Sequence, residues 1–145
     1  MEIVLEVSAT IAAGLFSGAA IYINLVEHPA RMQCGTDLAI KEFAPSYRRA
    51  TIMQVALAIV GLLMATAAWL KGGSIWWLVG GVTLVAVVPF TLLFILPTNH
   101  KLLEPSLGND SELASRLLVR WGRLHAIRSI LGLISFLIFA WINSR

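Results

Sequence analysis

The sequence carries little charge and almost no cysteine. Only 13% of its 145 residues are charged, against about 25% in soluble domains. The single cysteine excludes an internal disulfide and a CxxC pair for zinc or redox chemistry. Apolar residues make up 58% of the chain, and the mean hydropathy is +0.81. This composition excludes a disordered chain, a coiled coil and a collagen-like fibre, and it indicates an integral membrane protein.

Four apolar stretches are each long enough to cross a hydrocarbon core, which takes about 20 helical residues. They cover residues 7–26, 52–70, 75–96 and 124–142. The first stretch has no positively charged segment before it, so we expect it to be retained rather than cleaved as a signal peptide. The alternation of a β-barrel is absent. The sequence therefore predicts an all-α membrane protein in which residues 1–145 form a single four-helix transmembrane bundle.

Basic residues gather on the two long connections. Four spans put both long connections on one side and both termini, with the turn at Gly72-Gly73, on the other. Nine of the eleven basic residues belong to the first side: Arg31, Lys41, Arg48, Arg49, Lys101, Arg116, Arg120, Arg123 and Arg128. By the positive-inside rule we expect a protein of the cell (inner) membrane with cytoplasmic long connections and both termini outside. The net charge of +3 is explained by this placement, so we expect no nucleic-acid partner.

Prolines and periodicity predict three local features. A short helix from Asp37 to Phe43 is expected to end at Pro45, and Pro89 should kink the third span. The fourth helix should begin near Ser111 with a cytoplasmic amphipathic extension before its span. An apolar stripe and a basic stripe run side by side along this extension: Leu113, Leu117, Trp121 and Leu124, then Arg116, Arg120 and Arg123.

All three histidines are expected near the cytoplasmic ends of spans. His28 leaves the first span, His100 leaves the third and His125 enters the fourth. Arg128 lies about one turn inside the apolar part of the fourth span. Burial of an ionisable group in a membrane costs free energy, so such a residue is by default a candidate for a functional role. We expect Glu27 to be its partner.

Polar neighbours accompany each histidine. Asn24 precedes His28 by one turn, Asn99 directly precedes His100, and Trp121 shares a helix face with His125 and Arg128. Three chemical interpretations remain open. A metal such as iron, copper or zinc could use His28, His100 and His125; two of these histidines could hold a haem; or a pocket without a cofactor could deprotonate a phenolic or enolic substrate and stabilise its oxyanion.

Short ordered motifs along the whole chain resemble one family. Pro97-Thr98-Asn99 ends the third span, and Trp121, His125 and Arg128 form a W-x-x-x-H-x-x-R motif at the start of the fourth. His28-Pro29 and Tyr47-Arg48-Arg49 also fit. This pattern is similar to the anthrone oxygenase-like family of integral membrane proteins, long described as a domain of unknown function. The resemblance implies oxygenation of an anthrone, a tricyclic phenolic ketone, to an anthraquinone.

The resemblance also implies roles for individual residues. His125 would be the base or a ligand, Arg128 and Asn99 would stabilise the anion, and His28 would assist. Residues expected to contact a small apolar aromatic substrate are Trp121, Tyr22, Asn24, Glu27, Arg49 and Gln54.

Two other functions remain open on the sequence alone. The chain could be a non-enzymatic binding or assembly protein for haem, quinone or lipid. It could also be a small dimeric transporter, although a carboxylate near the middle of the membrane, which cation transport normally needs, is missing. Membrane lipid is an expected partner in every case, and the sequence leaves open a homo-oligomer.

Overall fold

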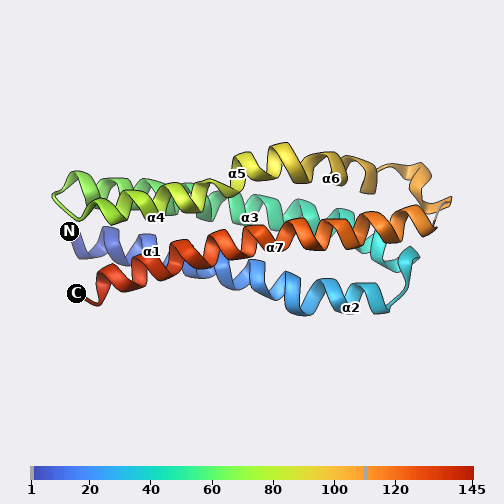
Figure 1. The fold of residues 1–145 in the computed structure, drawn as a ribbon, viewed down its shortest axis with the longest axis horizontal. Helices are drawn as coiled ribbons and strands as arrows, with labels where there is room; N and C mark the ends of the chain where they lie inside the picture. Colours follow the sequence, from blue (N-terminus) through green and yellow to red (C-terminus); the bar gives the residue numbers. More distant parts are fainter. Residues whose placement is uncertain (1, 110) are drawn as a thin grey trace.

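The computed structural model describes residues 2–109 and 111–145, and this part of the chain is helical except for short connections, with no strand. Four long rods form the fold (Figure 1). The first rod contains α1 (Glu2–Tyr22), the π-helix η1 (Ile23–Glu27) and α2 (His28–Gln33); the second is α3 (Thr36–Leu70). The third contains α4 (Ile75–Val85), α5 (Val87–Phe90), the π-helix η2 (Thr91–Ile95) and α6 (Leu96–Leu102). A short 3₁₀ helix η3 (Pro105–Asn109) precedes the fourth rod, α7 (Ser111–Asn143). The predicted all-α class is confirmed.

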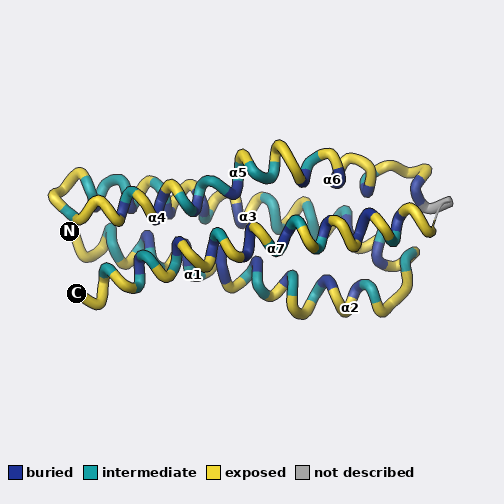
Figure 2. Tube along the Cα trace, in the orientation of Figure 1, coloured by how far each residue is buried: buried dark blue, intermediate teal, exposed yellow. Residues whose placement is uncertain are grey.

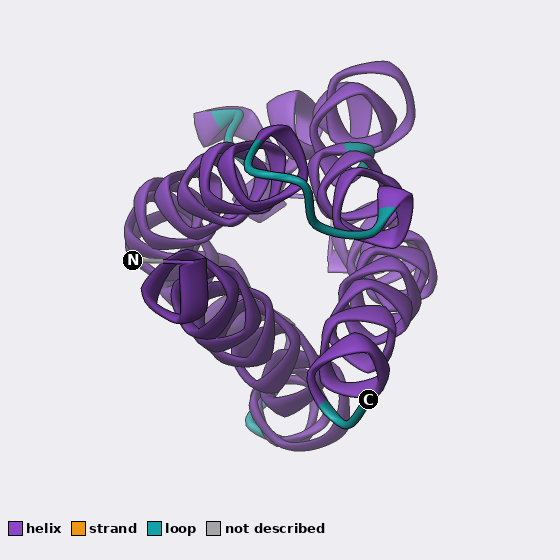
Figure 3. Ribbon diagram, turned by 90° about the vertical axis from the view of Figure 1, so that its left-hand side faces the viewer, coloured by secondary structure: helices purple, strands orange, loops and turns teal. Residues whose placement is uncertain are grey.

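The rods form an antiparallel four-helix bundle. Both α1 and α4 pack against α3 and against α7. Both termini and the tight turn between α3 and α4 lie at one end of the bundle (Figures 1 and 3). Gly72 in this turn has φ of 99°, a left-handed conformation that glycine adopts without steric cost. Both long connections therefore lie at the opposite end, as four spans require.

The outer surface of the bundle is apolar. Buried positions recur along the inward sides of the rods, and exposed positions lie outward (Figure 2). Large hydrophobic side chains are exposed along every rod, for example Leu15, Leu63, Val82 and Ile134. Within residues 2–109 and 111–145, four helices are long and apolar enough to cross a membrane. Such a surface is compatible with an integral membrane protein, because lipid can cover apolar side chains that water would not.

Two prolines have different effects. The prediction that a short helix ends at Pro45 is wrong, because α3 continues through this residue. Pro45 has no backbone N–H to donate to the carbonyl of Lys41, four residues earlier. Both residues are exposed. By contrast, the kink predicted near Pro89 is confirmed: α4 ends at Val85 and the chain resumes as α5. The segment from α5 onward is offset from the axis of α4 (Figure 1).

Both π-helices come directly before a proline in the following helix. The backbone N–H of His28 donates to the carbonyl of Ile23, and that of Leu96 donates to the carbonyl of Thr91. Pro29 and Pro97 follow at once. A proline ring crowds the carbonyl four residues earlier, and the wider π-turn relieves this crowding. Single π-turns inside α-helices occur often at functional sites.

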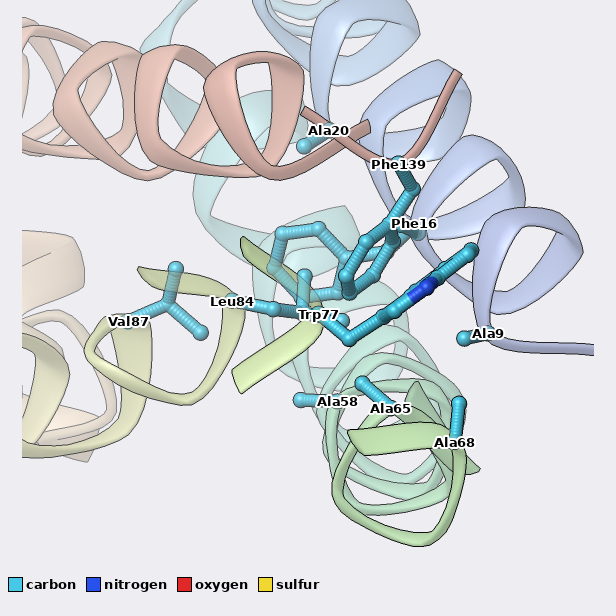
Figure 4. Packing of buried hydrophobic residues seen from close by; sticks show 11 residues of the cluster. Ala9, Phe16, Ala20, Ala58, Ala65, Ala68, Trp77, Leu84, Val87 and Phe139 are labelled. Atoms are coloured by element: carbon cyan, nitrogen blue, oxygen red, sulfur yellow. The ribbon is translucent and has the colours of Figure 1, made fainter. Parts of the chain in front are cut away.

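The buried apolar residues form two clusters along the bundle. The first contains Phe16, Ala58, Trp77, Leu84 and Phe139 among others (Figure 4). The second contains Ile23, Phe43, Ile95, Leu118 and Trp121 among others. On α3, on the third rod and on α7, the stretch of sequence between the two clusters contains polar residues: Gln54, Thr91, and His125 with Arg128. On the first rod, Asn24 directly follows Ile23 of the second cluster.

Helix packing in the first cluster depends on Gly80. A Cβ atom at this position would collide with the ring of Phe139, which stacks on Trp77 at 5.2 Å. We expect Gly80→Ala to lower the free energy of unfolding by about 1–3 kcal/mol, as overpacking does in cores. Gly18→Ala is the control, because no described atom lies within 4 Å of a Cβ there. Reversible denaturation in detergent measures both variants, and equal stabilities would contradict this packing.

Candidate functional site

A layer of polar side chains lies between the two apolar clusters. Asn24 comes from η1, Gln54 from α3, Thr91 from η2, and His125 and Arg128 from α7. The adjoining cavity has a volume of about 20 Å³, room for about one water molecule. Its walls come from all four rods and include Glu27, Gln54, Asn99, Trp121, His125 and Arg128.

Asn24 fixes the orientation of the His125 ring. Asn24 Nδ2 donates to the carbonyl of Gly122 at 3.0 Å, so Oδ1 is the atom 2.8 Å from His125 Nδ1. An amide oxygen only accepts, so His125 Nδ1 donates and Nε2 retains its lone pair in the neutral ring. Ser129 Oγ donates to the same Asn24 oxygen at 2.5 Å. His125 is 3% exposed and stacks on Trp121 with ring centroids 4.7 Å apart.

Arg128 carries a buried charge with neutral partners. Its side chain donates to Gln54 Oε1 at 2.5 Å and to Thr91 Oγ1 at 3.1 Å. The guanidinium carbon also lies 5.9 Å from the centre of the Phe16 ring. No carboxylate among the described residues forms an ion pair with it. A buried charge is costly unless an opposite charge compensates it, so this position favours an anion.

Several polar atoms around the cavity have no hydrogen-bond partner among the described protein atoms. They are Gln54 Nε2, both amide atoms of Asn99, Trp121 Nε1 and Arg128 Nε. Asn99 is fully buried and Gln54 is 2% exposed. Unpaired polar atoms are rare in protein interiors and call for a specific explanation. Four of these five atoms are N–H donors, the arrangement that an anion or a carbonyl oxygen requires.

Glu27 does not pair with Arg128, and that prediction is wrong. Arg31, one helical turn after Glu27, forms an ion pair with it and another with Glu42 on α3. Ser46 Oγ donates to Glu27 Oε1 at 2.7 Å. Glu27 therefore belongs to a closed ionic network at the edge of the cavity. Arg31 has two carboxylate partners there, which leaves Arg128 as the uncompensated cation of the layer.

The structure brings most of the predicted site residues together. Six of them line the cavity or bond to a residue that does: Asn24, Gln54, Asn99, Trp121, His125 and Arg128. Glu27 lies at its edge. His28 is buried against Trp121, with ring centroids 5.2 Å apart, and its Nε2 would lie only 2.6 Å from a Cβ on Gly122.

Three predicted residues lie elsewhere. Tyr22 and Arg49 line a separate outer groove between the first rod and α3. His100 is exposed, while its neighbour Asn99 is buried. The structure therefore does not unite His100 with His28 and His125. Among residues 2–109 and 111–145, no three His, Cys, Asp or Glu side chains are grouped as metal ligands.

Several participants were not assigned a site role from the sequence. Thr91 and Ser129 bond to Arg128 and Asn24, and Arg31, Tyr47 and Thr51 line the cavity. Two of these residues carried a signal. Arg31 is four residues after Glu27 and Ser129 four after His125, the spacing of neighbours on a helix.

The layer combines a proton acceptor with hydrogen-bond donors. His125 supplies the acceptor nitrogen, and Arg128, Gln54 and Asn99 supply N–H groups on the same cavity. Such a combination can remove a proton from a weak acid and stabilise the resulting oxyanion. The apolar clusters on both sides lower the local dielectric constant, which strengthens these electrostatic interactions.

Comparisons with known proteins agree on one family. The family model for anthrone oxygenase matches residues 43–138. The chain is 31% identical over 142 residues to anthrone oxygenase tpcL of Aspergillus fumigatus, covering 90% of this chain and 88% of the relative. It is 27% identical to anthrone oxygenase dmxR16 of Cryptosporiopsis sp., covering 88% and 79%. It is 30% identical to anthrone oxygenase AgnL2 of Paecilomyces divaricatus, covering 88% of each. No solved structure matches the chain.

Proposed function

Because this chain belongs to the anthrone oxygenase family, we propose that its polar layer catalyses oxidation of an anthrone-type ketone by O₂. The three relatives act on anthrones by name, and the resemblance in the sequence implies the same substrate class. Such a ketone is apolar enough to dissolve in a membrane and has a weakly acidic methylene group. The products are the corresponding quinone and water.

Arg128 is the observation that carries this proposal. Arg128 is 7% exposed, and among the described residues its hydrogen-bond partners are Gln54 and Thr91. A neutral ketone that becomes an oxyanion during the reaction would supply the missing charge only when it ionises. Interactions that strengthen as charge develops are the ones that accelerate a reaction. The site would therefore bind the ionised form better than the ketone.

The reaction begins with proton transfer. His125 Nε2 accepts a proton from the ring methylene, and the electron pair of that C–H bond delocalises onto the ketone oxygen. Arg128, with Asn99 and Gln54, stabilises the negative oxygen. Asn24 is a positioning residue in this scheme, because it holds Nδ1 of His125 and touches no reacting atom.

Oxygen then reacts with the electron-rich carbon. The carbanion transfers its electrons to O₂ and a C–O bond forms, which gives a hydroperoxide after protonation. The remaining hydrogen on that carbon leaves as a proton, the O–O bond breaks and water departs. The carbon becomes the second carbonyl of the quinone. The chain supplies the base and the donors, and O₂ is the co-substrate and the oxidant.

We also propose the orientation that the basic residues favour. The end that carries both long connections would face the cytoplasm, and the termini would lie outside. Arg116, Arg120 and Arg123 are exposed on α7 at that end, where they suit contact with anionic headgroups.

Turnover of a hydroxylated anthrone by the purified protein tests the proposal. Oxygen uptake and quinone absorbance are followed in detergent, and the protein-free oxidation rate is subtracted. We expect Asn99→Leu to lower kcat about 100-fold, the cost of one oxyanion donor. Asn143→Leu is the control, since Asn143 is exposed near the C-terminus. Wild-type turnover no faster than the protein-free rate would refute the function.

A further inference from the structure

A second, apolar pocket opens beside the polar cavity, between α3 and the segment α5–η2–α6. Its volume is about 100 Å³. Half of its ten lining residues are aliphatic: Val55, Val87, Val88, Leu92 and Leu96. Four residues line both this pocket and the polar cavity, namely Tyr47, Thr51, Gln54 and Arg128. One guanidinium therefore contributes to both spaces.

The size of the polar cavity limits what it can hold. About 20 Å³ admits one oxygen-sized group and excludes a fused ring system. A ligand whose oxygen reaches Arg128 must place its rings elsewhere. The apolar pocket is the adjoining space that includes Arg128, and its aliphatic wall suits a flat apolar ring.

The other neighbouring space is chemically different. The outer groove between the first rod and α3 has a volume of about 560 Å³ and is lined by Glu27, Glu42 and Arg49. Neither His125 nor Arg128 lines it. Because Arg128 does not line this groove, the groove lacks the cation that the oxyanion of such a molecule requires.

We infer that the apolar pocket between α3 and α5–η2–α6 binds the fused aromatic rings of the substrate. The substrate oxygen lies against Arg128, which lines both spaces, and the methylene edge of the central ring faces the polar cavity, which His125 lines. This inference rests on the proposed function and names its ring-binding subsite. Val88 and Leu96 are half-buried in the wall, whereas Leu92 is 57% exposed at the rim. Ligand pockets usually have about 300–1,000 Å³, so part of the ring system extends past this rim toward lipid. Substrate enters sideways from the bilayer.

The segment α5–η2–α6, which faces α3 across the pocket, has an irregular backbone. The helix is interrupted at Ala86, α5 has only four residues, and a π-turn comes next. Pro89 removes one backbone hydrogen bond from this segment. Fewer backbone bonds hold this wall than hold the unbroken α3 opposite.

Filling the pocket tests the inference. We expect Val88→Phe to raise KM for a three-ring anthrone about tenfold, the scale on which a pocket discriminates small changes in apolar bulk. Val82→Phe is the matched control, because Val82 is 52% exposed on α4 and lies outside the pocket. Val88→Ala should shift the ratio of kcat/KM values toward an anthrone with an added ring methyl group. This second variant keeps the test open if Val88→Phe fails to fold.

The possible outcomes separate this inference from the proposed function. Unchanged KM in Val88→Phe and an unchanged substrate ratio in Val88→Ala, with normal wild-type turnover, would overturn the ring subsite alone. Loss of co-purified phospholipid from Val88→Phe at unchanged KM would assign the pocket to a lipid chain and also overturn it. Absence of wild-type turnover would overturn both.

Discussion

Replacing Arg128 with methionine lowers kcat/KM for an anthrone about 1,000-fold, the upper end of the range for loss of an oxyanion stabiliser. Arg128 is the cation of the polar layer without a carboxylate partner among the described residues. Methionine retains much of the volume and removes both the charge and the donors. The loss should fall on kcat more than on KM, because the charge on the substrate develops only in the reaction. Steady-state oxygen uptake over a range of anthrone concentrations measures both constants.

Arg123→Met is the matched control for this variant. Arg123 lies on the same helix but is exposed, so its loss should leave kcat/KM within about twofold. Arg128→Lys should recover part of the activity, since lysine keeps the charge but lacks the planar fork that bonds Gln54 and Thr91 together. A correctly folded Arg128→Met variant with wild-type kcat would contradict the role of this residue.

Replacing His125 with glutamine lowers kcat about 100- to 10,000-fold, the contribution typical of a positioned general base. Glutamine can still donate a hydrogen bond to Asn24 but cannot accept a proton at neutral pH. The deficit should shrink as the pH rises, because hydroxide increasingly replaces the missing base. Initial rates across a pH series, with the protein-free rate subtracted at each pH, measure this effect.

His100→Gln is the control for the histidine variant. His100 is exposed and lies away from the polar layer, so kcat should remain at the wild-type value. A large loss in His100→Gln, together with normal activity in His125→Gln, would show that the exposed histidine carries the chemistry and that the buried one is structural.

Hydropathy predicts the bundle because the membrane restricts the options. Apolar stretches of this length can satisfy their backbone groups in lipid only as helices, so the number of rods and their antiparallel order can be derived from the sequence. The ends of the helices cannot. The helix expected to end at Pro45 instead continues through this residue as α3, which begins at Thr36 and runs on to Leu70. The effect of a proline depends on whether its surroundings can accommodate the unpaired carbonyl.

The sequence predicts the level of each site residue along the bundle, but not whether its side chain faces the interior. Topology places Asn99 and His100 at the same level, yet one is buried and the other exposed. Adjacent helical residues point about 100° apart, and the π-turns of η1 and η2 rotate the helical segments that come after them. Sequence spacing could not fix these rotations, and for the same reason it paired Glu27 with Arg128 instead of Arg31.

Hydrogen exchange at the substrate methylene tests the central claim most directly, namely that the chain's own side chains ionise the ketone. The purified protein is incubated with an anthrone in D₂O without oxygen, and deuterium incorporation is measured by mass spectrometry. We expect the wild type to accelerate exchange well above the buffer rate, and His125→Gln and Arg128→Met to return it to that rate. Aerobic turnover by a wild type that leaves anaerobic exchange at the buffer rate would contradict the account, because oxidation would then proceed without proton removal by His125.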